Sequence, residues 1–496
     1  MPSRRAPSSE SVLNRAPLAY KLLDHITGVL LAFVVVFTPW AFGATVPWAI
    51  WTTCGVSYAM GALLVAKWIY RSRGNFQVTT WADPMANSWP MRFLAFLSGS
   101  FLLYVLIGAV NYRATGTYVD GELELDYRDA ISWLPHSFNA PKSWRAFWRY
   151  LALVCLFWSA RDWLLGKSRR ERRPVEDFED VLVPLLPSRL RRFLWVFCIS
   201  SALLSLMGLL QRYDGSNKLL WILEARESNP NDFSFGPYSY RANAAQYFNL
   251  AWPVCLGFWW TLRKDSRRIR DRTVRAGSQS HVMLIPCLVF IATGPIASTS
   301  RGGALIFFAT TAAALLVMLW SLRSKPMAWL GIVGFFAASL TIAVVVGGDK
   351  LMERFETVFQ DKMSGRNVLY EVGHKMAADY PLFGTGAETF VSMYPLYRTD
   401  PTAQREGYAH DDWLETRITL GWVGLGILLA ALLTIPWNWF SGRGVPGSLE
   451  FVLLLAVALG GLLAHAKFDF PFQIFSLVTV FLLLACVGTC VRRESV

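Results

Sequence analysis

A histidine and two aspartates stand directly before a long apolar stretch of this 496-residue chain, in YAHDDWLETRITLGWVGLG at residues 408–426. Titratable side chains at the edge of an apolar stretch are costly to place and often mark a functional site. Three further segments join polar residues to apolar stretches in the same way. The polar residues of the four segments are Arg241 and Asn243; Arg301; Arg366, His410, Asp411, Asp412 and Glu415; and His465, Lys467 and Asp469.

These residue types suit an anionic ligand together with a proton transfer. The planar guanidinium of arginine matches the oxygens of a phosphate group. Histidine, whose unperturbed pKa is near neutrality, can accept a proton from an attacking hydroxyl. We therefore expect the arginines of these segments to bind an anionic group, and a histidine to accept a proton.

Each of these residues also has a simpler structural interpretation, and the sequence leaves both open. Arg301 could anchor a turn at the membrane surface, and Arg366 could be a solvated charge on a helix. His410 could cap the following helix together with Asp411, since aspartate favours helix N-termini. His465 and Asp469 could form a buried polar pair within a hairpin.

No metal site is expected, because no third carboxylate accompanies the Asp411–Asp412 pair. The seven cysteines show no C-x-x-C spacing, so neither a zinc site nor a redox centre is indicated. We expect no cofactor.

The composition excludes most soluble classes. Hydrophobic residues make up 54% of the chain and charged residues only 17%, and the apolar residues fall in runs of about twenty, the length that spans a bilayer. The net charge of +13 could indicate nucleic-acid binding, but the basic residues lie between the apolar runs. That placement is typical of cytoplasmic loops of a membrane protein, so no nucleic-acid partner is expected.

Twelve membrane spans are predicted, with every second connection basic, as in KSRRERR and RKDSRRIRDRTVR. The positive-inside rule places these connections and both termini in the cytoplasm. The polar segments then share the opposite side of the membrane. The predicted spans are 26–42, 45–68, 92–110, 145–165, 192–211, 243–262, 281–298, 303–321, 327–347, 412–436, 450–466 and 472–490.

The pattern divides the chain into four parts. A cytoplasmic segment at 1–25 precedes N-terminal spans at 26–229, and residues 230–475 hold the polar segments. The last span ends within 476–496, with the cytoplasmic tail. The connection at 348–411 is the longest, and its apolar residues at helical spacing predict short amphipathic helices lying over the bundle.

The polar segments resemble the O-antigen ligase and polymerase family of bacterial membrane proteins. HDDWLE before a glycine-rich apolar helix is similar to a family motif, although Asp411 stands where the family usually has asparagine. PLFGTGAETF at 381–390, the Ser300-Arg301-Gly302 turn and GPYSYRAN at 236–243 resemble further motifs, as does the spacing from His465 to Phe470. The resemblance covers roughly 230–475.

The resemblance implies an all-α integral membrane protein, GT-C-like, with about twelve transmembrane helices and a large periplasmic loop. It implies a glycosyltransferase that moves an undecaprenyl-diphosphate-linked glycan onto an acceptor sugar, such as lipid A–core, at the periplasmic face of the bacterial inner membrane. That reaction belongs to the biosynthesis of O-antigen, exopolysaccharide or lipopolysaccharide. Arg301, Arg366 and His410 would be catalytic. The substrate would contact Arg241, Asn243, Asp411, Asp412, Glu415, His465 and Asp469.

Polymerase and ligase remain equally open, and so does a different class. Twelve spans with both termini inside also suit a transporter or flippase of lipid-linked sugars. A transporter is expected to place charges near the middle of the membrane, often on broken helices. Here the middles of the predicted spans carry almost no charge, which favours the enzyme.

Overall fold

The computed structural model describes residues 16–74, 76, 80, 89–119, 122–168, 171, 185–215, 218–224, 234–272, 280–322, 334, 337–339, 341, 345, 364–398, 407–440 and 445–493. This part of the chain is mostly helical. The long helices are α1 (Leu18–Trp40), α2 (Pro47–Arg73), α3 (Trp89–Val110), α4 (Ala140–Leu164), α5 (Ser188–Asp214), α7 (Arg241–Arg272), α8 (Leu284–Ala297), α9 (Arg301–Leu322), α13 (Asp412–Phe440), α14 (Leu449–His465) and α15 (Phe475–Cys490).

The expected spans coincide with these helices, except for 327–347, which lies mostly outside the described residues. Seven helical stretches in the described part are long and apolar enough to cross a membrane, and α14 and α15 are apolar but shorter. The chain is therefore a multi-pass membrane protein. The total of twelve spans stays a prediction.

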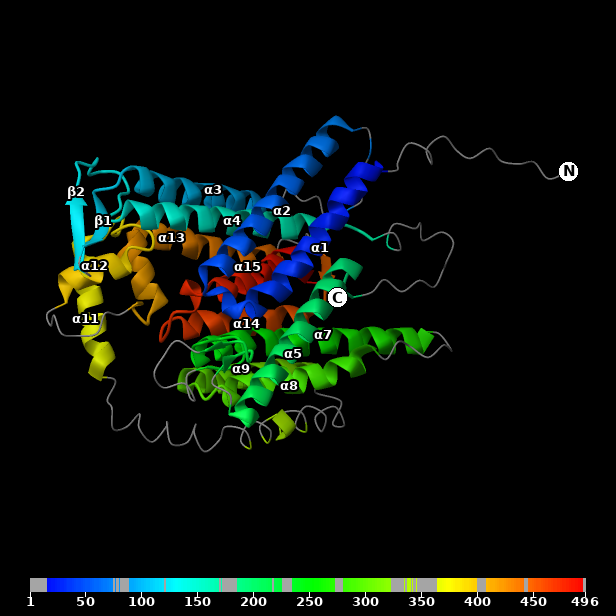
Figure 1. Ribbon diagram of the computed structural model, residues 1–496. Coiled ribbons are helices and arrows are strands. Elements are labelled where there is room, and N and C mark those ends of the chain that lie inside the picture. Colours follow the sequence, from blue (N-terminus) through cyan, green and yellow to red (C-terminus); the bar gives the residue numbers. More distant parts are fainter. Residues whose placement is uncertain are drawn as a thin grey trace.

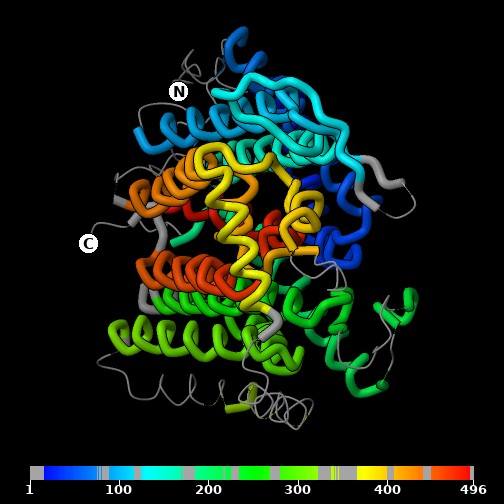
Figure 2. The backbone as a smooth tube through the Cα atoms, turned by 90° about the vertical axis from the view of Figure 1, so that its left-hand side faces the viewer, coloured from blue at the N-terminus to red at the C-terminus, as the bar shows by residue number. Residues whose placement is uncertain are grey.

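Most of the long helices run along one another, and two short helices lie at one end of the bundle (Figure 1). Helices α11 (Ser364–Asp379) and α12 (Phe390–Tyr397) lie at this end, where amphipathic helices were expected. Figure 2 looks onto it, with α11 and α12 in yellow in front of the bundle. Residues 354–363, where another helix was expected, lie outside the described part.

The all-α expectation needs one correction, because three pairs of short strands accompany the helices. β1 (Ala114–Val119) and β2 (Glu122–Tyr127) form an antiparallel hairpin, with Ala114 opposite Tyr127. The threonines, tyrosine and valine of β1 are residue types that favour strands. β3 (Lys218–Leu219) pairs antiparallel with β4 (Leu223–Glu224), and β5 (Val445–Gly447) pairs parallel with β6 (Val491–Arg493).

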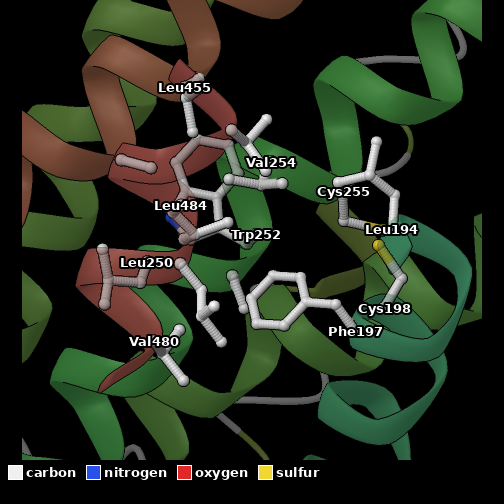
Figure 3. Close-up of a cluster of buried hydrophobic side chains, with 14 of the residues drawn as sticks. Leu194, Phe197, Cys198, Leu250, Trp252, Val254, Cys255, Leu455, Val480 and Leu484 are labelled. Carbon is white, nitrogen blue, oxygen red and sulfur yellow. The ribbon is translucent and has the colours of Figure 1, made fainter. Parts of the chain in front are cut away.

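The core of the bundle forms around α7, which contacts α14, α8 and α9. Trp252 of α7 is fully buried and lies beside Leu455 of α14 and Leu484 of α15 (Figure 3). On the far side of α7, Cys255 faces Cys198 of α5. Aromatic side chains of this size bury the largest apolar areas, so α7 is the helix around which its neighbours pack.

An ionic network joins α1, α2, α4 and α5. Lys67, which is fully buried, lies 2.6 Å from Asp162 and 3.6 Å from Asp24. Arg71 also binds Asp162, at 2.5 Å, and Arg189 binds Asp24, at 2.5 Å. These charges lie near helix ends, which agrees with the expectation that the middles of the spans carry few charges.

Helix α13 is broken at Gly421, whose φ of 61° and ψ of −168° belong to a region essentially restricted to glycine. The glycine-rich segment 381–386 docks at the break. The amide N–H of Trp422 donates to Pro381 O at 2.9 Å, and that of Thr385 donates to Ile418 O at 2.8 Å. A Cβ atom on Gly421 would lie 2.2 Å from Leu382 O. The first part of α13 is thereby held at the end of the bundle, next to α11 and α12.

Candidate active site

His410 lies directly before α13, at the end of the bundle where the loop helices gather. Its φ of 51° is positive, which is uncommon for a residue other than glycine and is found most often at functional sites. The imidazole Nδ1 lies 3.3 Å from Asp469 Oδ1, and the ring edge meets Phe470 with centroids 4.8 Å apart. The His410 side chain is 21% exposed, so one side of the ring remains accessible.

Asp469 is the residue that orients this imidazole. It is 3% exposed and lies in the turn between α14 and α15, where the Phe470 amide N–H also donates to it at 3.1 Å. The Phe470 ring stacks on Tyr408 at 4.3 Å and on Tyr240 at 5.6 Å. Three segments distant in the sequence therefore hold the turn that carries Asp469.

Arg366 comes from α11 and reaches the same turn. Its Nη1 donates to Phe468 O at 2.9 Å. Tyr370, one helical turn later on α11, donates its hydroxyl to His410 O at 3.1 Å. Helix α11 thus contacts both the α14–α15 turn and the residue directly before α13, so Arg366 and His410 lie at the same end of the bundle.

The other two arginines face the same place, as the surroundings of Tyr240 show. Burial raises the pKa of the Tyr240 hydroxyl, and so does the nearby charge of Asp469. Arg366, Arg241 and Arg301 all act in the opposite direction and lower that pKa. Charges on α11, at the start of α7 and at the start of α9 therefore act on the same hydroxyl.

His465 lies behind the turn that carries Arg301. A Cβ atom on Gly302 would lie 3.1 Å from the imidazole Nε2 of His465, so this glycine lets α9 approach α14 closely. His465 is 1% exposed, and its Nδ1 has no hydrogen-bond partner in the described part of the chain. Asn243 on α7 is also buried, and its Oδ1 is similarly unpaired among described residues.

The three acidic residues around His410 hold the backbone in place. Asp411 caps α13 by accepting the Leu414 amide N–H at 3.1 Å, and it also forms an ion pair with Lys467. Asp412 accepts the Phe472 amide N–H at 2.7 Å. Glu415 accepts the Ala409 amide N–H at 2.8 Å. The capping interpretation holds for Asp411, while the predicted substrate contacts of these acids stay predictions.

Two aromatic residues escaped the sequence analysis, Tyr240 and Tyr370, and Phe470 was noted only as the end of a motif. Tyr240 stands inside a segment already singled out, GPYSYRAN. In the sequence these aromatic residues stand close to charged ones, and this proximity was the available signal. It did not single them out, because aromatic residues are frequent in any membrane protein. Their stacking across three segments becomes visible only in three dimensions.

The site combines permanent cations, an oriented imidazole and a position at the end of apolar helices. Within the described residues, no group of three or more His, Cys, Asp or Glu side chains could hold a metal ion. The arrangement can bind an anionic group and accept a proton beside it. These features define the class: a multi-pass helical membrane protein with a charged site at one end of the bundle.

Comparison with protein families narrows this class. Residues 286–429 match the family model described as O-antigen ligase. Residues 286–429 therefore form an O-antigen ligase domain, and this domain contains Arg301, Arg366 and His410. The match lies inside the predicted region 230–475, whose wider bounds stay a prediction. Among curated proteins, comparison finds none that matches.

Proposed function

We propose that this protein transfers or polymerises an undecaprenyl-diphosphate-linked glycan onto an acceptor sugar hydroxyl. One observation carries the proposal: the imidazole of His410 is held by Asp469 at 3.3 Å, beside Arg366, within the O-antigen ligase domain or adjoining it. The reaction takes place at the periplasmic face of the inner membrane, with both termini in the cytoplasm. It supplies surface polysaccharide, including lipopolysaccharide.

In this mechanism the arginines act on the donor. Arg301, Arg366 and Arg241 hold the diphosphate and stabilise the negative charge that develops as it leaves. Fixed cations aimed at developing charge are often the largest contribution to catalysis. The bond between the anomeric carbon and the diphosphate oxygen breaks, and undecaprenyl diphosphate is released without help from a metal ion.

His410 acts on the acceptor. Asp469 accepts the Nδ1–H of the imidazole, which leaves Nε2 as the proton acceptor. Nε2 takes the proton of the acceptor hydroxyl while its oxygen attacks the anomeric carbon from the face opposite the diphosphate. The configuration at that carbon is inverted.

Complementation of a strain that lacks this gene tests the proposal, with surface polysaccharide compared on a gel at equal membrane levels. His410→Ala should lower transfer by about 10²–10⁴-fold, the usual contribution of a general base. Arg301→Ala should lower it by about 10²–10³-fold, as for loss of one charge-stabilising donor. The exposed residues His374 and Arg145 offer matched controls, and their alanine variants should behave like wild type.

The pattern of products separates the remaining alternatives. Glycan of normal length that fails to reach its final acceptor indicates a ligase, and short glycan on the carrier indicates a polymerase. Activity that persists in a chelator supports metal-independent transfer. If both alanine variants behave like wild type, while lipid-linked sugar accumulates on the cytoplasmic side in the deletion strain, the protein is a flippase.

A further inference from the structure

A cavity of about 270 Å³ lies between α3, α4, α13, α14 and α15. Its walls are formed mostly by leucine, isoleucine, valine, alanine and aromatic side chains. The lining follows α15 from Val478 to Thr489, roughly 16 Å of helix, so the cavity is elongated along the bundle. An elongated apolar cavity inside membrane-spanning helices fits a hydrocarbon chain.

One end of this cavity is polar, and it is the end next to His410. Asp412 and Glu415 on α13 line it, together with Gln473 and Glu388. Asp412 follows His410 by two residues, so a group at this end lies close to the imidazole. The cavity also reaches Ile435 and Ala485, which lie near the C-terminal ends of α13 and α15, away from the polar end.

The polar end selects against an anion. No lysine or arginine is among the described residues that line the cavity, whereas three carboxyl groups are. Glu388 is paired with Arg149 at 2.8 Å, and the other two accept backbone N–H groups. Carboxyl and amide oxygens accept hydrogen bonds from hydroxyl groups, whereas none of the described lining residues offers a cation that would bind a diphosphate.

We propose that this cavity binds the hydrocarbon chain of an amphiphile whose head group, where it meets the chain, is uncharged and bears hydroxyls. The inference rests on the proposed transfer reaction and adds to it. The diphosphate donor lies on the arginine side of His410, and a hydroxyl-bearing lipid of the acceptor class lies on the carboxylate side. The imidazole then stands between the two substrates.

Photolabelling in phospholipid nanodiscs tests the site without relying on transfer. The probe is a decyl glucoside with a diazirine in its alkyl chain, and labelled peptides are identified by mass spectrometry. Label is expected on 425–435 and 478–489. Unlabelled decyl glucoside should compete with the probe, and decyl phosphate should compete poorly.

A matched pair of variants on α13 controls for labelling from the surrounding bilayer. Leu432 lines the cavity, and the neighbouring Leu433 is 67% exposed on the outer surface. Leu432→Trp should lower labelling about fivefold or more. The larger side chain would fill the space of the probe's alkyl chain and weaken its binding by at least that factor. Leu433→Trp should leave it unchanged. Ala485→Phe, from the opposite wall, should repeat the effect of Leu432→Trp.

The outcomes separate this inference from the proposed function. His410→Ala should lose transfer and keep full labelling. If labelling behaves as expected but no variant changes glycan transfer, the cavity is assigned to the amphiphile and the proposed function is wrong. If Leu432→Trp and Leu433→Trp label alike, or if decyl phosphate competes better than the glucoside, the proposed ligand is wrong.

Discussion

Three contacts hold His410. Nδ1 of its imidazole lies 3.3 Å from Asp469 Oδ1, Phe470 packs against the ring, and the backbone carbonyl accepts the Tyr370 hydroxyl. The open side of the ring remains for a reacting hydroxyl. A residue in an uncommon backbone conformation and held this firmly is suited to catalysis, because its geometry is set before the substrate binds.

The role of Asp469 can be tested with Asp469→Asn. The amide keeps the size of the carboxylate but loses its charge, so the imidazolium formed during transfer loses its partner. We expect kcat to fall about tenfold or more, as when a residue that orients a catalytic histidine is changed. KM for the donor should stay near the wild-type value. A large rise in that KM with unchanged kcat would instead assign Asp469 to donor binding.

At the scale of elements, the break in α13 is the feature that builds the site. Gly421 allows the helix to change direction, and segment 381–386 supplies hydrogen-bond partners for the broken backbone. Tyr104 of α3 adds its hydroxyl, which lies 2.7 Å from both Phe383 O and Leu420 O. The first turns of α13 thereby meet α11 and the α14–α15 turn.

Gly421→Ala tests this arrangement. An alanine would be strained in this backbone conformation and its Cβ would collide with Leu382 O. We therefore expect the free energy of unfolding to fall by about 1–3 kcal/mol or more. Gly426, on the same helix, has open space around it. Gly426→Ala should be neutral or slightly stabilising. The measurement is the thermal unfolding midpoint of each purified variant. Equal midpoints for Gly421→Ala and Gly426→Ala would contradict the role of the break.

The ionic network between α1, α2, α4 and α5 leads to a second stability prediction. Asp162→Asn leaves the buried ammonium of Lys67 without its carboxylate at 2.6 Å. Removing one partner of a buried pair costs about 3–5 kcal/mol. A lower unfolding midpoint and a lower membrane yield are expected. Asp126→Asn, at an exposed position on β2, should change neither. An unaffected Asp162→Asn variant would show that Asp24, 3.6 Å from Lys67, is enough to stabilise the buried ammonium.

At the scale of the whole molecule, the two ends of the bundle differ. Helices α11 and α12 and the β1–β2 hairpin gather at one end (Figure 1), and the charged site lies among them. The basic ends of α2 and α7 belong to connections predicted to be cytoplasmic. This polarity suits an enzyme whose substrates reach it from one side of the membrane.

Cysteine labelling tests the orientation. Glu371→Cys on α11 and Ser72→Cys on α2 both place the thiol at an exposed position. A maleimide that cannot cross the inner membrane should label the first variant in cells with a permeabilised outer membrane. It should label the second only after lysis. The reverse pattern would invert the proposed topology.

The sequence by itself determined the class of protein and most of its helices. A run of about twenty apolar residues can satisfy its backbone in a bilayer only as a helix, so the spans follow from local composition. The motif segments likewise pointed to Arg301 and His410 as candidate site residues, and the family resemblance added Arg366 of the longest connection; their catalytic roles stay predictions. The β1–β2 hairpin escaped because a connection between spans carries a weaker local signal.

Only the tertiary structure decided which of these residues meet. His410 and Asp469 lie on separate elements, and their contact depends on the break at Gly421 and on the stack around Phe470. The cavity beside Asp412 is lined by α3, α4, α13, α14 and α15, which meet only in the folded bundle. Such arrangements depend on packing between elements distant along the chain, and no local pattern encodes them.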